Sequence, residues 1–181
     1  MNSFEIDCLL RKTLSTNAVN FLGVFPKDKV AGLRDSHTSY PLCFVANTDV
    51  SSAPGTHWVA FYFADRIHCE FWDSFAQSPS LYGFESSDPN LVVNQNTVQV
   101  QSFDANECGH HCITFLYLRT HGRSLPQVIE TYTNIMTAQS FADKFARSFV
   151  ENLKSHAGPD CEPDSCPSGT QCCTSRNSWC K

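Results

Sequence analysis

Apolar residues along the chain fall into strand-length and helix-length patterns. Short apolar runs bounded by turn residues predict strands at 41–47, 57–63 and 67–73, and a two-residue alternation predicts a further short strand at 97–101. Apolar residues that recur every three or four positions predict amphipathic helices. These helices are expected at 3–14, 125–136 and 140–153, with a short helix around 81–84 in a loop-rich region.

Finer details of three segments also follow from the pattern. The run 21–26 is apolar, but Gly23 and Pro26 interrupt it, so we expect a packed loop rather than a strand. Ser3 is expected to cap the first helix. The core-facing residues are expected to be Phe4, Cys8 and Leu9 in the first helix, and Phe141, Phe145, Phe149 and Leu153 in the last.

Cys108 precedes the most apolar helix-length run of the chain, 113–119. We therefore expect its sulfur near the amino end of a buried helix, where unpaired N–H groups and the helix dipole favour a thiolate. Gly109 is expected to leave space around the sulfur, and Gly122 with Pro126 should end the helix. A buried structural cysteine is the alternative, but the pattern favours a nucleophile.

His57 and Asp73 lie at the open end of the predicted hairpin 57–73. A three-residue connection, 64–66, keeps the apolar residues on one face and sets His57 opposite Asp73. A two-residue turn would mix apolar and polar faces. An imidazole held by a carboxylate is what a general base for a thiol requires. The alternative is an ordinary histidine at a sheet edge beside a solvated carboxylate.

Length and composition favour one globular domain. The chain has 181 residues, 41% of them hydrophobic, which suits a single full core. The order of elements predicts an α+β fold: a small mixed or antiparallel sheet flanked by helices, with the nucleophile at the amino terminus of a central buried helix. We assign residues 1–155 to this domain and residues 156–181 to a tail.

Charge and hydropathy exclude some partners. The net charge is −5, and residues 41–107 contain one basic side chain against eight acidic ones. A polyanion such as DNA would find no broad basic field, so we expect nucleic-acid binding to be weak or absent. No run is as long as a membrane span, and the amino terminus has no signal pattern, so we expect an intracellular protein without membrane contact.

The tail contains half of the ten cysteines of the chain. Its composition resembles the opening of a granulin repeat over about 20 residues. Three interpretations stay open: a disulfide knot, a zinc site that could include His156, and a flexible tail. The spacing lacks paired Cys-x-x-Cys motifs, and we expect no metal in the catalytic site. The tail cysteines are Cys161, Cys166, Cys172, Cys173 and Cys180.

Four segments, in order, resemble the adenovirus endopeptidase (adenain) family of cysteine proteases. They are Phe21-Leu22-Gly23, the run 43–48, the histidine segment 55–61, and Gln101 followed after six residues by Cys108-Gly109 and Cys112. The resemblance covers about residues 3–155. More distantly, the chain is similar to the SUMO-deconjugating cysteine proteases, which share the same order of catalytic residues.

The resemblance implies a role for each candidate residue. Cys108 would be the nucleophile, His57 its general base and then acid, and Asp73 the residue that orients the imidazole, where adenovirus enzymes have Glu. Gln101 would donate a hydrogen bond to the oxyanion together with the backbone N–H of Cys108. Gln99 is the alternative donor. His110 and His111 follow Cys108 on its own helix and should not reach its sulfur.

The resemblance also implies a substrate class. It suggests that viral or virus-like precursor proteins are cut at Gly-containing sites during particle maturation, in the host nucleus and the virion. A deconjugating protease for a ubiquitin- or SUMO-like modifier is the alternative, and an inactive binding module is a further one.

The family's cofactors have weak counterparts in this chain. Adenovirus enzymes bind an activating viral peptide through a Cys eleven residues before the oxyanion Gln, but Asn90 stands at that place here. We therefore expect no bound cofactor, an activating peptide held non-covalently or through another thiol if one exists, and little stimulation by DNA.

Overall fold

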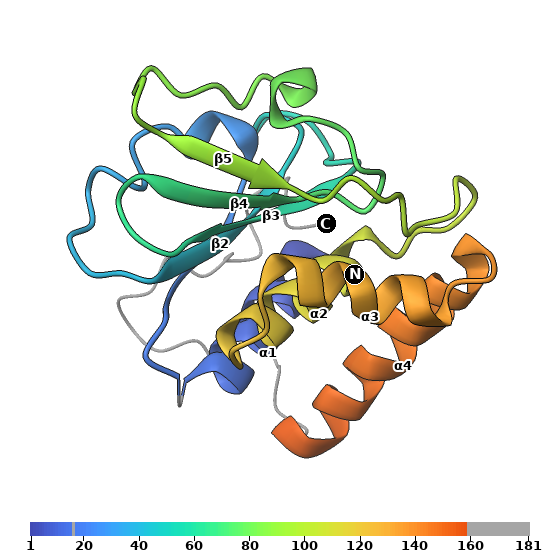
Figure 1. Ribbon diagram of the computed structural model, residues 1–181. Coiled ribbons are helices and arrows are strands. Elements are labelled where there is room, and N and C mark those ends of the chain that lie inside the picture. The colour runs from blue at the N-terminus through green and yellow to red at the C-terminus, as the bar shows by residue number, and fades with distance from the viewer. Residues whose placement is uncertain (16, 159–181) are drawn as a thin grey trace.

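The computed structural model describes residues 1–15 and 17–158, which form a five-stranded sheet with α-helices on one side (Figure 1). The strands lie in sequence order; β1–β2 and β4–β5 are parallel, whereas β2–β3 and β3–β4 are antiparallel. The prediction of an α+β fold with a small mixed sheet is confirmed. The strands are β1 Asn20–Phe25, β2 Leu42–Asn47, β3 Trp58–Phe63, β4 His68–Trp72 and β5 Val92–Gln95. The helices are α1 Ser3–Leu14, α2 Cys108–Thr120, α3 Leu125–Ile135 and α4 Gln139–Ala157, with 3₁₀ turns η1 Lys27–Lys29 and η2 Pro79–Tyr82.

The expectation of a packed loop at 21–26 is wrong, because most of this segment forms the edge strand β1. Its pairing with β2 shifts register between Phe21 and Val24, where Gly23 adopts a φ of +133°. The glycine therefore creates a local irregularity instead of ending the strand. Pro26 lies just beyond the last residue of β1, where no ladder hydrogen bond is needed.

The hairpin β3–β4 exists, but its predicted register is wrong by two positions. Phe63 pairs with Cys69 rather than with Ile67. The connection begins at Asp65, whose Oδ1 accepts hydrogen bonds from the backbone N–H groups of Ile67 and His68, at 2.8 and 2.9 Å. The turn that the Asp65 side chain closes therefore lies one residue further along the chain than expected. A shift of two residues preserves the faces, so the apolar side chains still share one side.

A strand was predicted at 97–101, but the last strand within the described residues is β5, which lies earlier, in the region expected to be loop. In the predicted segment, the backbone N–H groups of Val100 and Gln101 both donate to the carbonyl of Ser74, at 2.9 and 3.1 Å. Two N–H groups that bond to the same carbonyl do not form the regular hydrogen-bond pattern of paired strands, so this segment is a loop. The short helix expected at 81–84 is the 3₁₀ turn η2, displaced toward the amino terminus.

The helices are where the sequence places them, but the cap of α1 and the buried faces of α1 and α4 differ from expectation. Phe4 and Cys8 of α1 are only partly buried, whereas Leu9 lies in the core as expected. Asn2, not Ser3, caps α1, because its side chain accepts a hydrogen bond from the backbone N–H of Glu5. Phe141 in α4 is 51% exposed, since α4 turns its smaller residues inward, where they allow close packing against the core. The buried residues of α1 are Ser3, Ile6, Leu9, Leu10 and Leu14, and those of α4 are Ala142, Asp143, Ala146, Val150 and Leu153.

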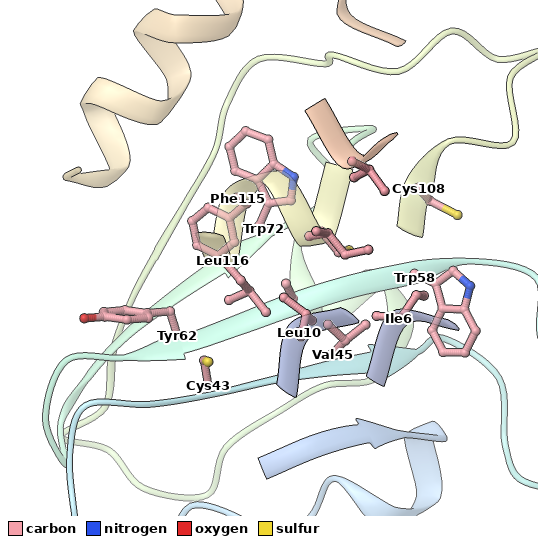
Figure 2. Close-up of a cluster of buried hydrophobic side chains, with 14 of the residues drawn as sticks. Ile6, Leu10, Cys43, Val45, Trp58, Tyr62, Trp72, Cys108, Phe115 and Leu116 are labelled. Carbon is pink, nitrogen blue, oxygen red and sulfur yellow. The ribbon is translucent and has the colours of Figure 1, made fainter. Parts of the chain in front are cut away.

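Both faces of the sheet are covered. On the helix side, Trp72 of β4 stacks on Phe115 of α2 with ring centroids 5.0 Å apart (Figure 2). On the other side, a second cluster of phenylalanines from β2, β3 and β4 packs under side chains from β1 and the loops. This double burial explains why β2 and β3 are buried along their whole length.

Helix α2 begins at Cys108 and runs through the middle of the helix layer, as predicted. Gly122, with a φ of +89°, follows its end, and its N–H donates to the carbonyl of Arg119. Within residues 1–15 and 17–158, no helix combines the length and apolar character needed to cross a membrane. Apart from its first three residues, the predicted tail lies outside the described residues, together with all five of its cysteines.

Candidate active site

Cys108 is the first residue of α2 and is only 9% exposed. Figure 2 shows it at the edge of the helix-side cluster, with its sulfur directed away from the rings of Trp72 and Phe115. Burial raises the pKa of the thiol, but hydrogen bonds from His57 and from the backbone N–H groups of Trp58 and Gly109 outweigh this and lower it. The site therefore favours a thiolate.

Gly109 allows close packing between α1 and the start of α2. A Cβ at this position would lie 3.0 Å from Cδ1 of Ile6 in α1, which is tighter than ordinary packing allows. The glycine therefore lets α1 approach the first turn of α2, and so fixes the helix end that carries Cys108.

His57 directly precedes β3 and is 8% exposed. Its Nε2 lies 2.6 Å from Oδ1 of Asp73, which leaves Nδ1 for the hydrogen bond with Cys108. Burial lowers the pKa of the imidazole, whereas the hydrogen bonds with Asp73 and Cys108 raise it, and the result is a pKa of about 9. At neutral pH these shifts favour an imidazolium beside a thiolate.

Asp73 lies just beyond β4 and is fully buried. Its carboxylate accepts hydrogen bonds from His57, from the backbone N–H groups of Phe75 and Gln77 at 3.1 and 2.9 Å, and from the hydroxyl of Tyr82 at 2.9 Å. Burial raises the pKa of Asp73, but the hydrogen bond and charge of His57, together with the backbone donors, lower it. The carboxylate is thus held in its charged form and in one orientation.

Asn96 fixes the backbone of Asp73 and was not anticipated from the sequence. Its Oδ1 accepts from the N–H of Asp73 at 2.9 Å, and its Nδ2 donates to the carbonyl of Asp73 at 2.7 Å. Tyr82 and Phe75 were also missed; their rings lie 5.8 and 5.0 Å from the imidazole of His57. Tyr82 lies in the 3₁₀ turn η2 and the other two lie in loops, where hydrophobic periodicity gives no signal.

Gln101 is 2% exposed and lies in the loop before α2. Its Oε1 accepts a hydrogen bond from the hydroxyl of Ser74 at 2.7 Å, and its Nε2 donates to the carbonyl of Ala105 at 2.6 Å. Gln99 donates its amide to the backbone carbonyl of Gln101 at 2.8 Å. The structure thus brings Cys108, His57 and Asp73 into one hydrogen-bonded series, and Gln101 is connected to that series through Ser74, the neighbour of Asp73.

The two histidines that follow Cys108 are engaged elsewhere. His111 is fully buried between the hydroxyl of Tyr132, at 3.1 Å, and Oδ1 of Asp143, at 3.0 Å. Nδ1 of His110 lies 2.5 Å from Oε2 of Glu107, and burial is the main cause that lowers the pKa of His110. Neither is hydrogen-bonded to Cys108, in agreement with the expectation from helix geometry.

Helix α4 holds both ends of the loop that leads from Gln101 to Cys108. Oδ2 of Asp143 accepts a hydrogen bond from the backbone N–H of Ser102 at 3.1 Å. One turn later, Arg147 donates to Oε1 of Glu107, with Nε at 3.0 Å. Because both contacts come from one helix, the loop has fixed ends next to the candidate nucleophile.

Comparisons with known proteins find two adenovirus proteases among the similar sequences. The chain is 28% identical over 141 residues to the protease of Human adenovirus D serotype 9, covering 68% of this chain and 62% of that protein. It is 30% identical over 112 residues to the protease of Human adenovirus D serotype 17, covering 52% and 54%. The matched regions thus span less than two thirds of either relative.

The chain matches no protein-family profile. The central domain of the uncharacterized Lpg1148 protein from Legionella pneumophila superposes with a TM-score of 0.53 at 11% identity, over 85% of this chain and 98% of that domain. This likeness concerns the fold alone. From the two sequence matches, the chain is a distant homologue of the adenovirus proteases.

Proposed function

We propose that this chain is a cysteine endopeptidase in which Cys108 is the nucleophile, His57 the base and Asp73 the orienting acid. The observation that carries the proposal is the buried series of hydrogen bonds from Asp73 through His57 to Cys108 at the start of α2. A lowered thiol pKa beside a raised imidazole pKa is the arrangement that thiol proteases need. The distant homology to adenovirus proteases supports the same activity.

The chemistry follows from the ion pair. The Cys108 thiolate attacks the carbonyl carbon of a peptide bond, a C–S bond forms, and the carbonyl π electrons move onto oxygen. When that oxyanion collapses, the C–N bond breaks, and the imidazolium of His57 gives its proton to the leaving amine. A water molecule, deprotonated by His57, then hydrolyses the thioester and regenerates the thiol. Asp73 stabilises the imidazolium without itself taking the proton.

The oxyanion would be stabilised by Gln101 and by the backbone N–H of Cys108. The amino end of α2 supplies a positive dipole at this place, and Gln101 has a side-chain amide held by two hydrogen bonds. Removal of a single oxyanion donor typically slows turnover by about 10²–10³-fold. The proposal therefore requires Gln101 to contribute to turnover rather than to substrate binding.

We further propose that the substrates are precursor proteins of a virus or virus-like element, cut at Gly-containing sites during particle maturation in the host nucleus and virion. Cys108 and His57 are each less than 10% exposed, which favours a small residue beside the scissile bond. Any activating peptide would bind without a disulfide at Asn90, which is exposed and whose N–H donates to Asp88.

The test is incubation of the purified protein with a library of Gly-containing peptides, with cut sites identified by mass spectrometry. We expect cleavage beside glycine by the wild-type protein and none by Cys108→Ala. A parallel sample contains a ubiquitin-like modifier joined through its diglycine terminus to a lysine. Cleavage of that substrate alone would overturn the proposed substrate class, and equal cutting by the Cys108→Ala variant would overturn the proposed nucleophile.

A further inference from the structure

Ser74 is tied to Gln101 by two hydrogen bonds and to the neighbouring Val100 by a third, and it has no role in the chemistry described so far. Its side chain is 1% exposed, and its hydroxyl donates to Oε1 of Gln101 at 2.7 Å. Its backbone carbonyl accepts the N–H groups of both Val100 and Gln101, at 2.9 and 3.1 Å. Buried polar groups are hydrogen-bonded, and this close contact indicates that Ser74 holds the side-chain amide of Gln101 in place.

The partners of Gln101 allow one orientation of its amide. The carbonyl of Ala105 only accepts hydrogen bonds, so it must face Nε2, at 2.6 Å. A flipped amide would set the oxygen of Gln101 against that carbonyl, and two acceptors would repel each other. Ser74 then supplies the donor that Oε1 needs. A primary amide has two N–H groups, so one remains after the bond to Ala105.

We propose that Ser74 is a positioning residue that orients Gln101 so that its remaining N–H faces the oxyanion. This inference rests on the proposed function, in which Gln101 is the oxyanion donor. Ser74 follows Asp73 directly in the chain. The dipeptide Asp73-Ser74 thus holds the base through one side chain and the oxyanion donor through the other, and sets the separation between them.

A double-mutant cycle tests this coupling through kcat and KM on a cleaved peptide. The proteins are wild type, Ser74→Ala, Gln101→Ala and the double variant. We expect Ser74→Ala to lower kcat by about ten- to a hundredfold, less than loss of the whole donor, with KM within about threefold of wild type. In the Gln101→Ala background, the Ser74→Ala change should have no further effect, because its target is already gone.

Two outcomes of the cycle contradict the inference. One is a wild-type kcat for Ser74→Ala. The other is an equal loss in both backgrounds, which would mean that Ser74 acts through another residue such as Asp73. Ser74→Thr keeps the hydroxyl and should restore most of the kcat, whereas Ser74→Cys, a weak donor of similar size, should not. Ser80→Ala, an exposed serine whose hydroxyl lies 2.8 Å from that of Ser78, is the matched control and should leave kcat unchanged.

A second measurement does not depend on protease activity. In ¹⁵N-labelled protein, the side-chain amide signals of Gln101 are identified by their loss in Gln101→Ala. We expect them to shift in Ser74→Ala and their hydrogen exchange to accelerate, with no such change in Ser80→Ala. Unchanged Gln101 signals in Ser74→Ala would overturn the positioning role even in a chain that cleaves nothing. Changed signals without any wild-type cleavage would instead place the failure in the proposed function.

Discussion

The carboxylate of Asp73 lies 2.6 Å from Nε2 of His57, although the two residues do not face each other across the β3–β4 ladder. Continuing the register past the pair of Ala60 and Trp72 sets Asp73 opposite Val59. The contact is therefore a diagonal one, at the end of the hairpin where both strands have stopped. The paired strands bring the two residues near each other, and the segment after Asp73 and Asn96 then hold Asp73 in place.

Asp73→Asn should narrow the pH range of activity from both sides. The raised pKa of His57, about 9, depends in part on the carboxylate, so its removal lowers that pKa and moves the alkaline limb of the rate profile to lower pH. The thiolate then loses the positively charged imidazolium of His57 beside it. The pKa of Cys108 therefore rises, and the acidic limb of the rate profile moves to higher pH. The measurement is kcat/KM against pH, with Asp65→Asn, an exposed aspartate beside His68, as control. An unshifted alkaline limb would contradict the assigned role of Asp73.

Cys108→Ala should abolish cleavage without unfolding the protein, and His57→Ala should do nearly the same. A nucleophile and its base act as a unit, so the double variant should be no slower than Cys108→Ala alone. Initial rates on one peptide, together with thermal melting of each variant, provide the check. Residual cutting by the Cys108→Ala protein would exclude this cysteine as nucleophile.

Gln101→Ala should reduce kcat by about 10²–10³-fold and leave KM nearly unchanged. Gln99→Ala is the matched control, because Gln99 also contributes a side-chain amide, which donates to the backbone of Gln101. We expect a much smaller loss for Gln99→Ala. A normal rate for Gln101→Ala with a crippled Gln99→Ala would transfer the donor role to Gln99.

Arg147→Ala should destabilise the fold and loosen the loop before α2. Arg147 is half exposed, but its partner Glu107 is buried, and loss of the arginine leaves that carboxylate without its cation. We expect a measurable loss in the free energy of unfolding, because a buried carboxylate that loses a donor is left partly unsatisfied. Lys154→Ala removes an exposed ion pair with Glu151 and should cost less than about 0.5 kcal/mol. Urea unfolding of both variants measures the difference, and equal costs would show that the buried carboxylate has no special need for Arg147.

Duplex DNA should stimulate cleavage weakly or not at all. Residues 41–107 have a charge of −7, and Arg11, Arg34, Arg119 and Arg147 are each paired with a carboxylate. DNA binding depends on the number of phosphates that free cations neutralise. The assay compares cleavage rates with and without DNA at low and moderate salt. A large rate increase that moderate salt removes would reveal a basic surface that the sequence does not predict.

The α-helices and the strands β2, β3 and β4 could be predicted because they follow hydrophobic periodicity. The helix that begins at Cys108 and the strands that bring His57 near Asp73 are set by buried apolar residues, whose spacing is visible in the sequence. The register error at the hairpin came from Asp65, whose side chain closes the turn by bonding two backbone N–H groups. Such a contact leaves no trace in the apolar pattern.

The supporting residues of the site could not be predicted for the same reason. Ser74, Tyr82 and Asn96 act through hydrogen bonds in loops or in a 3₁₀ turn, and their partners are not their neighbours in the sequence. The strand β5 was missed because its residues are largely exposed. An exposed edge strand has no core face to produce alternation, so only the folded chain reveals it.

The four hydrogen bonds that converge on the Asp73 carboxylate have a consequence for protein engineering. Phe75, Gln77 and Tyr82 are all placed to fit a carboxylate at the reach of aspartate. A glutamate, as the resemblance to adenovirus enzymes implies at this place, is longer by one methylene, about 1.5 Å. Replacing Asp73 by glutamate alone would move the carboxylate away from these hydrogen-bond donors. The acid and the loop that follows it, residues 73–82, would therefore have to be exchanged together.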